Sequence, residues 1–174
     1  ALFNNTGTSV IYRYLPENEN IASFMASLGG VLGEYLPTNI QDVSISPLKN
    51  NIFYLVEKDS VVNGFIKDME NGSTKTIFSH PFTEWVSDWS NENIYLTTKA
   101  SSYVTGSTYI LNQENQTINK IIGGVVGLTS RVSRDGSKLV FSESTKGGPK
   151  LYLYDIKNNT TTDLKLYGIA EKCV

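Results

Sequence analysis

The sequence predicts an all-β protein built from about four four-stranded blades of the β-propeller type. A turn-forming corner recurs at Ser46, Ser90 and Ser133, with spacings of 44 and 43 residues. Apolar segments rich in Val, Ile, Thr and aromatic residues follow each corner, and turn residues interrupt the chain about every eight to twelve positions. A repeat of about 40 to 45 residues that holds four short strands is typical of a propeller blade.

The corner is clearest at residues 133–141, SRDGSKLVF, where Asp135-Gly136 predicts a two-residue turn with positive φ angles between antiparallel strands. Residues 90–96 and 46–54 repeat the pattern as SNENIYL and SPLKNNIFY. Further landmarks keep the same period of 42 to 44 residues: the asparagines Asn71, Asn115 and Asn158, the glycines Gly64, Gly106 and Gly148, and the aromatic residues Phe65, Tyr109 and Tyr152.

The expected strands follow this period through three repeat units. The second unit, residues 41–82, is predicted to contain strands at 42–46, 51–57, 64–68 and 74–79. The third unit, residues 83–125, is predicted to contain strands at 84–88, 93–98, 108–112 and 117–122. The fourth unit, residues 126–169, is predicted to contain strands at 128–132, 138–142, 150–155 and 162–167.

The first unit, residues 1–40, fits the repeat less closely. Residues 5–7, Asn-Thr-Gly, predict a corner, and strands are expected at 8–14, 21–27 and 33–36. A helix over 21–32 is the competing interpretation because Ala22, Met25, Ala26 and Leu28 favour helix. The glycines at 29, 30 and 33 would keep that helix short, so the repeat favours strands.

We expect residues 1–174 to form a single propeller domain. When the repeat is extended back to the first unit, the chain begins after the first strand of that unit would end, so this strand is expected to be missing. At the other end, residues 170–174 are predicted to form a spare innermost strand. That strand could pair with the first unit and close a small ring in the Velcro manner, or the chain could be part of a longer propeller, which we favour. A homo-oligomer would also hide the open blade edges.

Composition excludes several classes of partner. The net charge is −2, charged residues make up 18% of the chain, and no cluster of Lys or Arg occurs, so nucleic acid is not an expected partner. No apolar run approaches the roughly 20 residues that span a bilayer, so this segment is not expected to insert into a membrane. A leader or anchor upstream of Ala1 stays possible.

The corners resemble the β-propeller repeats of the TolB type, relatives of the WD-repeat propellers, whose hallmark is Trp-Ser-Pro-Asp-Gly-Lys before an apolar strand. Trp89-Ser90 matches its first half, Ser46-Pro47 its middle, and residues 133–138 its second half, but no unit carries the whole pattern. The resemblance covers about residues 41–174. It implies a non-enzymatic binding platform, in a periplasmic, cell-surface or extracellular protein, or a gating domain beside a hydrolase.

Residue types that could support chemistry each have a structural alternative that we favour. Five N-x-Ser/Thr triplets are possible glycosylation acceptors, but Asn also favours turns; they begin at Asn4, Asn71, Asn115, Asn158 and Asn159. His80 lacks the G-x-S-x-G motif of a serine hydrolase and is expected in a loop. The glycine-rich segments 123–127 and 146–149 are expected to be loops and not phosphate cradles, since no helix follows.

Other reactive types also lack a pattern. The acidic pairs Glu17/Glu19 and Asp155/Asp163 show no common spacing, and Trp85, Asp88 and Trp89 are predicted as core. Cys173, the single cysteine, excludes an internal disulfide and a cysteine-built metal site, and a small buried hydrophobe is favoured over a reactive thiol. We therefore expect no catalytic residue, no metal site and no cofactor.

Propeller geometry predicts one binding face. Connections between units, and those between the second and third strands, emerge at the same end of the ring. This end would gather residues of mixed charge with a tyrosine and a histidine, which suit a protein or peptide partner: Lys58, Asp59, His80, Glu84, Lys99, Tyr103 and Lys146. The expected function is a non-catalytic interaction or scaffold module, with a gating or substrate-binding segment of a larger hydrolase and a component of a cell-surface assembly as alternatives.

Overall fold

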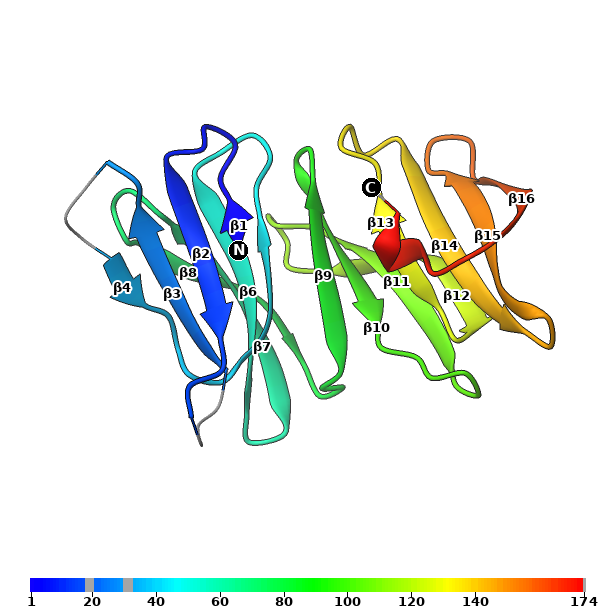
Figure 1. Ribbon diagram of the computed structural model, residues 1–174, viewed down its shortest axis with the longest axis horizontal. Coiled ribbons are helices and arrows are strands. Elements are labelled where there is room, and N and C mark those ends of the chain that lie inside the picture. Colours follow the sequence, from blue (N-terminus) through cyan, green and yellow to red (C-terminus); the bar gives the residue numbers. More distant parts are fainter. Residues whose placement is uncertain (18–20, 30–32, 174) are drawn as a thin grey trace. The chain divides into compact units, whose positions relative to one another are not determined.

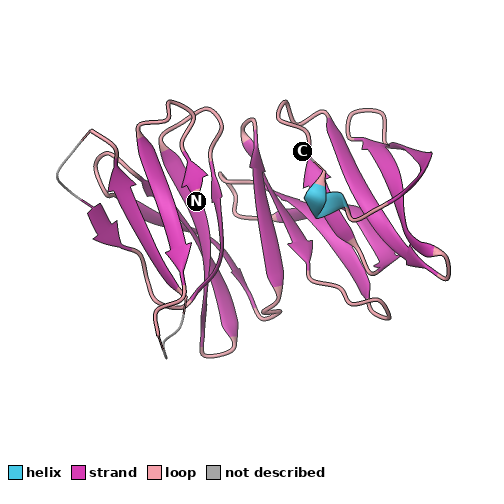
Figure 2. Cartoon of the chain, in the orientation of Figure 1, coloured by secondary structure: helices cyan, strands magenta, loops and turns pink. Residues whose placement is uncertain are grey.

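A computed structural model describes residues 1–17, 21–29 and 33–173 of the chain. These residues form four four-stranded antiparallel sheets and one short 3-10 helix (Figure 2). The chain divides into two compact units, Ala1–Thr83 and Glu84–Val174, and each unit holds two sheets. We call each sheet a blade and number the blades in chain order.

The first unit contains blades 1 and 2, drawn in blue to green in Figure 1. Blade 1 consists of β1 (Leu2–Phe3), β2 (Ser9–Tyr14), β3 (Ala22–Ser27) and β4 (Gly33–Tyr35). Blade 2 consists of β5 (Ile40–Ile45), β6 (Asn51–Lys58), β7 (Val61–Asp68) and β8 (Thr74–His80).

The second unit contains blades 3 and 4, drawn in green to red in Figure 1. Blade 3 consists of β9 (Trp85–Ser90), β10 (Asn93–Thr98), β11 (Thr105–Leu111) and β12 (Ile118–Val126). Blade 4 consists of β13 (Thr129–Val132), β14 (Lys138–Thr145), β15 (Gly148–Asp155) and β16 (Thr160–Tyr167), and helix η1 (Ala170–Lys172) follows it. In all four blades consecutive strands pair, so strand order in the sheet equals order in the chain.

Each unit has a hydrophobic core between its two blades. In the first unit Ile11 and Met25 of blade 1 pack with Ile52 and Tyr54 of blade 2. In the second unit the cluster includes Tyr95, Ile122, Leu139, Phe141 and Tyr154. The second strand of a blade is paired along both of its edges, and in blades 2, 3 and 4 it carries fully buried residues: Ile52, Ile94 and Leu139.

Blade 1 corrects one expectation about the start of the chain. A first strand is present: Leu2 pairs with Ile11 and Phe3 with Val10. The predicted corner at 5–7 follows it, where the Asn4 N–H donates to the Ser9 carbonyl oxygen. Residues 22–27 form strand β3, so the competing helix over 21–32 is wrong for the residues that the structure describes, while residues 30–32 lie outside them.

The C-terminal segment corrects a second expectation. Residues 170–174 are not an innermost strand: Ala170–Lys172 form a 3-10 turn, and Val174 lies outside the described residues. The N–H groups of Lys172 and Cys173 donate to the carbonyl oxygens of Ile169 and Ala170, three residues back. The Ala170 N–H donates to the hydroxyl of Thr129 in β13 (3.1 Å), so turn contacts and one side chain satisfy these donors in place of a strand ladder.

The Asp135-Gly136 corner differs from the two-residue turn that was predicted. Gly136 has φ = 72°, but Asp135 is not among the residues with positive φ. Ser133 pairs with Lys138 through their backbone groups, so four residues form the loop. The Asp135 carboxylate accepts hydrogen bonds from the Ser133 hydroxyl (2.6 Å) and the Ser137 N–H (3.1 Å), which holds the wider loop together.

Two glycine-rich segments expected as loops lie partly in strands. Strand β12 continues to Val126 and so includes Gly123 and Gly124. Its pairing with β11 changes register between Gly106 and Ser107. Only Gly127 and Leu128 separate β12 from β13, and Gly127 has φ = 61°, a conformation that favours glycine. Likewise Gly148 begins β15, which leaves Lys146 and Gly147 as the connection from β14.

Candidate functional site

Three of the predicted binding residues lie in the first unit, at one end of blade 2. Lys58 ends β6 and pairs with Val61, so Asp59 and Ser60 form a two-residue hairpin turn in which φ is 53° and 60°. His80 ends β8 opposite Val62, at the same end of the blade. Its ring stacks on Phe78 with centroids 6.0 Å apart, and its Nδ1 accepts the Phe82 N–H (3.0 Å).

The other four predicted residues lie in the second unit. Glu84 precedes β9 and its carbonyl oxygen accepts the Lys99 N–H (2.9 Å), so these two exposed residues sit side by side at one end of blade 3. Tyr103 lies in the connection from β10 to β11, and Lys146 in the connection from β14 to β15. The expectation that all seven residues share one face involves both units and stays a prediction.

Tyr103 and Lys146 meet at a hollow of about 520 Å³ in the second unit. The Tyr103 side chain is 94% exposed, and turn contacts hold its backbone: the Val104 N–H donates to the Ser101 carbonyl oxygen (3.1 Å). The lining residues come from the β10–β11 connection and the β14–β15 hairpin: Ser102, Tyr103, Ser144, Thr145, Lys146, Gly148 and Pro149. An exposed aromatic ring, an ammonium group and several hydroxyls therefore converge there.

A second hollow, of about 330 Å³, shares Ser102, Ser144 and Pro149 with the first. Its other lining residues reach toward the inner strand of blade 4 and the C-terminal segment: Ala100, Ser101, Gly127, Thr129, Ser142 and Ile169. We call the two adjoining hollows the blade 3–4 groove. Its lining is mostly small residues and hydroxyl groups, with Lys146 as a charge and Tyr103 as an aromatic contact at one end.

The sequence predicts Tyr103 and Lys146 in connections, where the structure places them, but it does not predict the seryl and threonyl residues of the groove. These residues have no motif, and their hydroxyls come from strands and loops about 40 positions apart. Only the juxtaposition of blades 3 and 4 brings them together. The alternation of β14, which places Ser142 and Ser144 on the same side, is the one signal that the sequence offers.

Asp88 links blades 3 and 4 beside this core. Its carboxylate accepts the Val132 N–H (3.0 Å) and lies 3.7 Å from the Arg131 guanidinium. Burial nevertheless raises the pKa of Asp88 above its usual value, and the contacts with Val132 and Arg131 only partly offset this. Trp85 and Trp89 are buried, as expected of core residues. The hydrogen bond from Val132 of β13 makes Asp88 a structural link between blades 3 and 4.

The N-x-Ser/Thr asparagines take part in a periodic turn. Asp68, Asn112 and Asp155, spaced by 44 and 43 residues, each accept the N–H of the asparagine three positions later. The side chains of Asn71 and Asn115 in turn accept N–H groups two residues further on. These asparagines therefore lie in turns, as the sequence predicts. The residue with positive φ is not the asparagine itself but the one after it: Gly72, Gln116 and Asn159.

Other candidate chemistry is limited in the described chain. No group of three or more His, Cys, Asp and Glu among the described residues could hold a metal ion. In the same residues no helix is long and apolar enough to cross a membrane. Cys173 is half-buried, and its thiol lies 4.0 Å from the Ile169 carbonyl oxygen.

The chain is similar in structure to several solved propeller proteins. TolB from Acinetobacter baumannii has a TM-score of 0.70 at 13% identity, over 93% of this chain and 42% of that one. The β-propeller domain of the Trilobed protease from Pyrococcus furiosus gives 0.65 at 11%, over 90% and 53%. The acylaminoacyl peptidase of Pyrococcus horikoshii gives 0.66 at 12%, over 93% and 31%. The four sheets are β-propeller blades.

These blades are thus similar to those of TolB-like and peptidase propellers, as the corner residues suggested. The chain spans less than two thirds of the length of each of these three proteins. No protein-family model matches the sequence, and no curated protein matches it either. At such low identity the similarity establishes the fold, and both non-enzymatic TolB and peptidases share it.

Proposed function

We propose that this chain is a non-catalytic propeller module that binds a protein or peptide partner in the blade 3–4 groove. The observation that carries the proposal is the convergence of Tyr103 and Lys146 on a hollow of about 520 Å³. Exposed tyrosines are favoured anchors in protein interfaces because they supply a large contact area with few rotatable bonds. The resemblance to TolB-type repeats supports a periplasmic, cell-surface or extracellular location as part of the proposal.

The groove also suggests which peptides it would prefer. Lys146 supplies a positive charge beside the Tyr103 ring, and Ser102, Ser144 and Thr145 supply hydroxyls that can donate or accept hydrogen bonds. An acidic side chain or a terminal carboxylate could pair with the ammonium group, while a neighbouring apolar residue packs on the ring. We therefore propose acidic peptide segments as the preferred ligands.

A selection from a random peptide library on the immobilised chain tests this function. Selected peptides should bind the Tyr103→Ala variant at least about tenfold more weakly, because truncation of an aromatic anchor costs about 2 kcal/mol or more. Lys146→Glu should abolish binding of the acidic peptides, and Lys75→Ala, an exposed residue of β8, is the matched control. Peptides that bind all variants equally would refute the groove as the binding site.

A second candidate is a gating or substrate-binding propeller of a larger hydrolase. The specific observation is the similarity to peptidases: the chain covers 31% of the Pyrococcus horikoshii acylaminoacyl peptidase and 29% of a prolyl endopeptidase, with TM-scores of 0.66 and 0.69. Mass spectrometry of the protein purified from its source separates the two candidates. A hydrolase domain in the same polypeptide would favour the second.

A further inference from the structure

Both methionines of the chain line one hollow between blades 1 and 2, within the first unit. Met25 belongs to β3 of blade 1, and Met69 follows β7 of blade 2, one repeat period of 44 residues later. The hollow has a volume of about 270 Å³. Its other lining residues are small or polar: Ser9, Ala26, Ser27, Gly33 and Glu34. Each blade thus contributes one thioether side chain to the contact.

Met25 lies in the core of the first unit. Its side chain is 8% exposed and packs in one cluster with Ile11 of blade 1 and Tyr54 of blade 2. A long, unbranched and apolar side chain is well suited to fill the irregular space between two sheets. The packing of the two blades at this point therefore depends on a thioether group that stays apolar.

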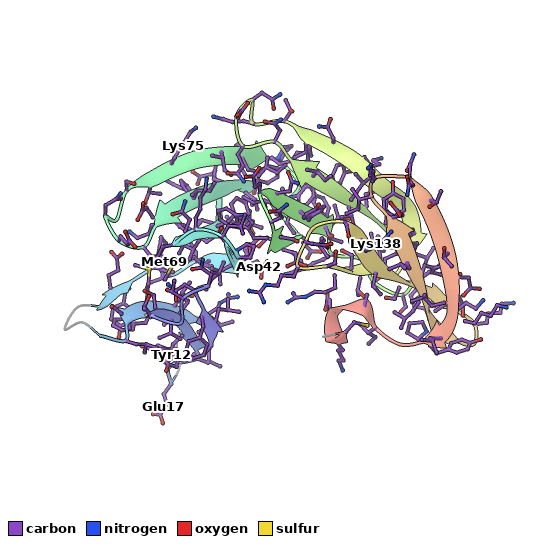
Figure 3. All side chains as sticks on the ribbon, turned by 90° about the horizontal axis from the view of Figure 1, so that it is seen from above. Tyr12, Glu17, Asp42, Met69, Lys75 and Lys138 are labelled. Carbon is purple, nitrogen blue, oxygen red and sulfur yellow. The ribbon has the colours of Figure 1, made fainter. Side chains whose placement is uncertain are left out.

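Met69 is half-buried and packs against the same cluster, where blade 1 faces blade 2 (Figure 3). Its N–H donates to the Asn50 carbonyl oxygen (2.9 Å). In the same turn the Asp68 carboxylate accepts the Glu70 N–H (2.8 Å). These hydrogen bonds fix the backbone of the turn and hold the Met69 side chain at the contact between the blades.

The hollow opens to solvent on its polar side. Ser27, Gly33 and Glu34 are exposed residues of blade 1 at this opening. The Glu34 carboxylate lies 3.0 Å from the Lys67 ammonium of blade 2, so an ion pair spans the two blades beside the hollow. A space of this size with polar walls holds small polar molecules. Hydrogen peroxide, which is little larger than water, therefore has access to the methionine side chains.

We propose that Met25 and Met69 are sites of reversible oxidation and that they form an oxidation-sensitive contact between blades 1 and 2. A sulfur lone pair forms an S–O bond with one oxygen of hydrogen peroxide while the O–O bond breaks, and the second oxygen leaves as water. Sulfur is oxidised and peroxide is reduced. The product is a polar sulfoxide, which methionine sulfoxide reductases return to the thioether.

The two methionines differ in the order and in the effect of this reaction. Met69 reacts first because it is more exposed than Met25. Its sulfoxide lies near the open side, where water and hydroxyl groups can donate to the new oxygen. A sulfoxide at Met25 lies in the apolar core, where a polar group without a hydrogen bond opposes burial. Oxidation of Met25 is therefore the step that loosens blade 1 from blade 2.

Peptide mapping by mass spectrometry, combined with hydrogen exchange, tests the proposal. Cys173→Ser serves as the background because it removes the one other sulfur atom of the chain. Hydrogen peroxide should add one oxygen atom to Met69 before it adds one to Met25. Once Met25 is oxidised, amide exchange in β2 and β3 should become faster by about tenfold or more, while β10 and β14 of the second unit keep their rates. Methionine sulfoxide reductases should restore the original rates.

Two substitutions separate the chemistry from packing. Met25→Leu keeps a similar volume, so it should fold and make exchange in β2 and β3 insensitive to peroxide. Met25→Gln places a polar group in the core without peroxide and should reproduce the faster exchange. Met69→Leu is the matched control, in which the response of Met25 to peroxide is retained. Should Met25→Gln fail to fold, the comparison of oxidised and reductase-treated protein decides the same point.

Three outcomes would overturn the proposal. Methionines that stay unoxidised until urea unfolds the protein show that peroxide does not enter the hollow. Unchanged exchange in β2 and β3 after oxidation of Met25 shows that the contact tolerates the sulfoxide and that the methionines only fill space. A response to peroxide that persists in Met25→Leu places the sensitive group elsewhere.

Discussion

At the scale of single residues, Asp88 combines a favourable hydrogen bond with an unfavourable buried charge. We predict that Asp88→Asn leaves the free energy of unfolding unchanged or raises it at neutral pH, because the amide oxygen can still accept the Val132 N–H and no charge is buried. Asp88→Ala should lower it by about 1–3 kcal/mol, since the Val132 N–H then loses its acceptor. Urea denaturation of the two variants measures both effects.

The raised pKa of Asp88 also fixes the sign of a pH effect. The folded state favours the protonated carboxyl, so the wild type gains stability relative to Asp88→Asn as pH falls through the folded pKa. The advantage of the Asn variant should therefore be largest at neutral pH and smallest in acid. If the stability advantage of Asp88→Asn over the wild type instead grows as pH falls, burial does not raise the pKa of Asp88.

The pKa values of Asp135 and Asp155 are lowered, in contrast to the raised pKa of Asp88. Hydrogen bonds from Ser133 and Ser137 lower the pKa of Asp135 to about 2, and the Lys138 ammonium with the Asn158 N–H lowers the pKa of Asp155 to about 2. Their contribution to stability is complete above the ordinary value of about 3.9 and is lost as pH falls toward 2. The melting temperature should drop in this interval, and the drop should be smaller in Asp135→Asn and in Asp155→Asn.

At the scale of secondary-structure elements, the β6–β7 hairpin is strained at its turn. Asp59 and Ser60 both have positive φ, which costs a residue with a Cβ about 1–2 kcal/mol. Ser60→Gly should therefore raise the free energy of unfolding by up to about 1 kcal/mol, after the greater chain entropy of glycine is subtracted. The same substitution within strand β8, Ser79→Gly, should lower the free energy of unfolding by about 0.5–1 kcal/mol. Chemical denaturation compares the two, and a loss of stability in Ser60→Gly would contradict the turn geometry.

At the scale of the whole molecule, we predict that local stability differs among the strands according to their burial. The second strands carry fully buried residues such as Ile52, Ile94 and Leu139, whereas most residues of the outer strand β16 are exposed. Hydrogen exchange should therefore be slowest in β6, β10 and β14, and fastest in β16. Mass spectrometry of exchanged peptides tests this, and equal protection across a blade would contradict it.

The sequence by itself determined the repeat, the strands and the places of the turns. These features depend on local chemistry: alternation of apolar residues specifies strands, and Asp, Asn and Gly specify turns at a constant period. Two predictions from the sequence were wrong because the conformation of a segment there depends on which other strand it meets. Leu2 and Phe3 form a strand because they pair with β2. Residues 170–172 form a 3-10 turn next to β13 and not a strand. The same limit explains the Asp135-Gly136 loop, whose width depends on the hydroxyls of Ser133 and Ser137.

Only the tertiary structure decided which faces and side chains meet. The approach of Tyr103 to Lys146 and the hydrogen bond from the Val132 N–H to Asp88 join residues that are 43 and 44 positions apart in the sequence. Local propensities carry no information about such contacts, because they depend on how neighbouring sheets stack. The period identified the blades, and the packing of neighbouring blades decided which side chains line the blade 3–4 groove.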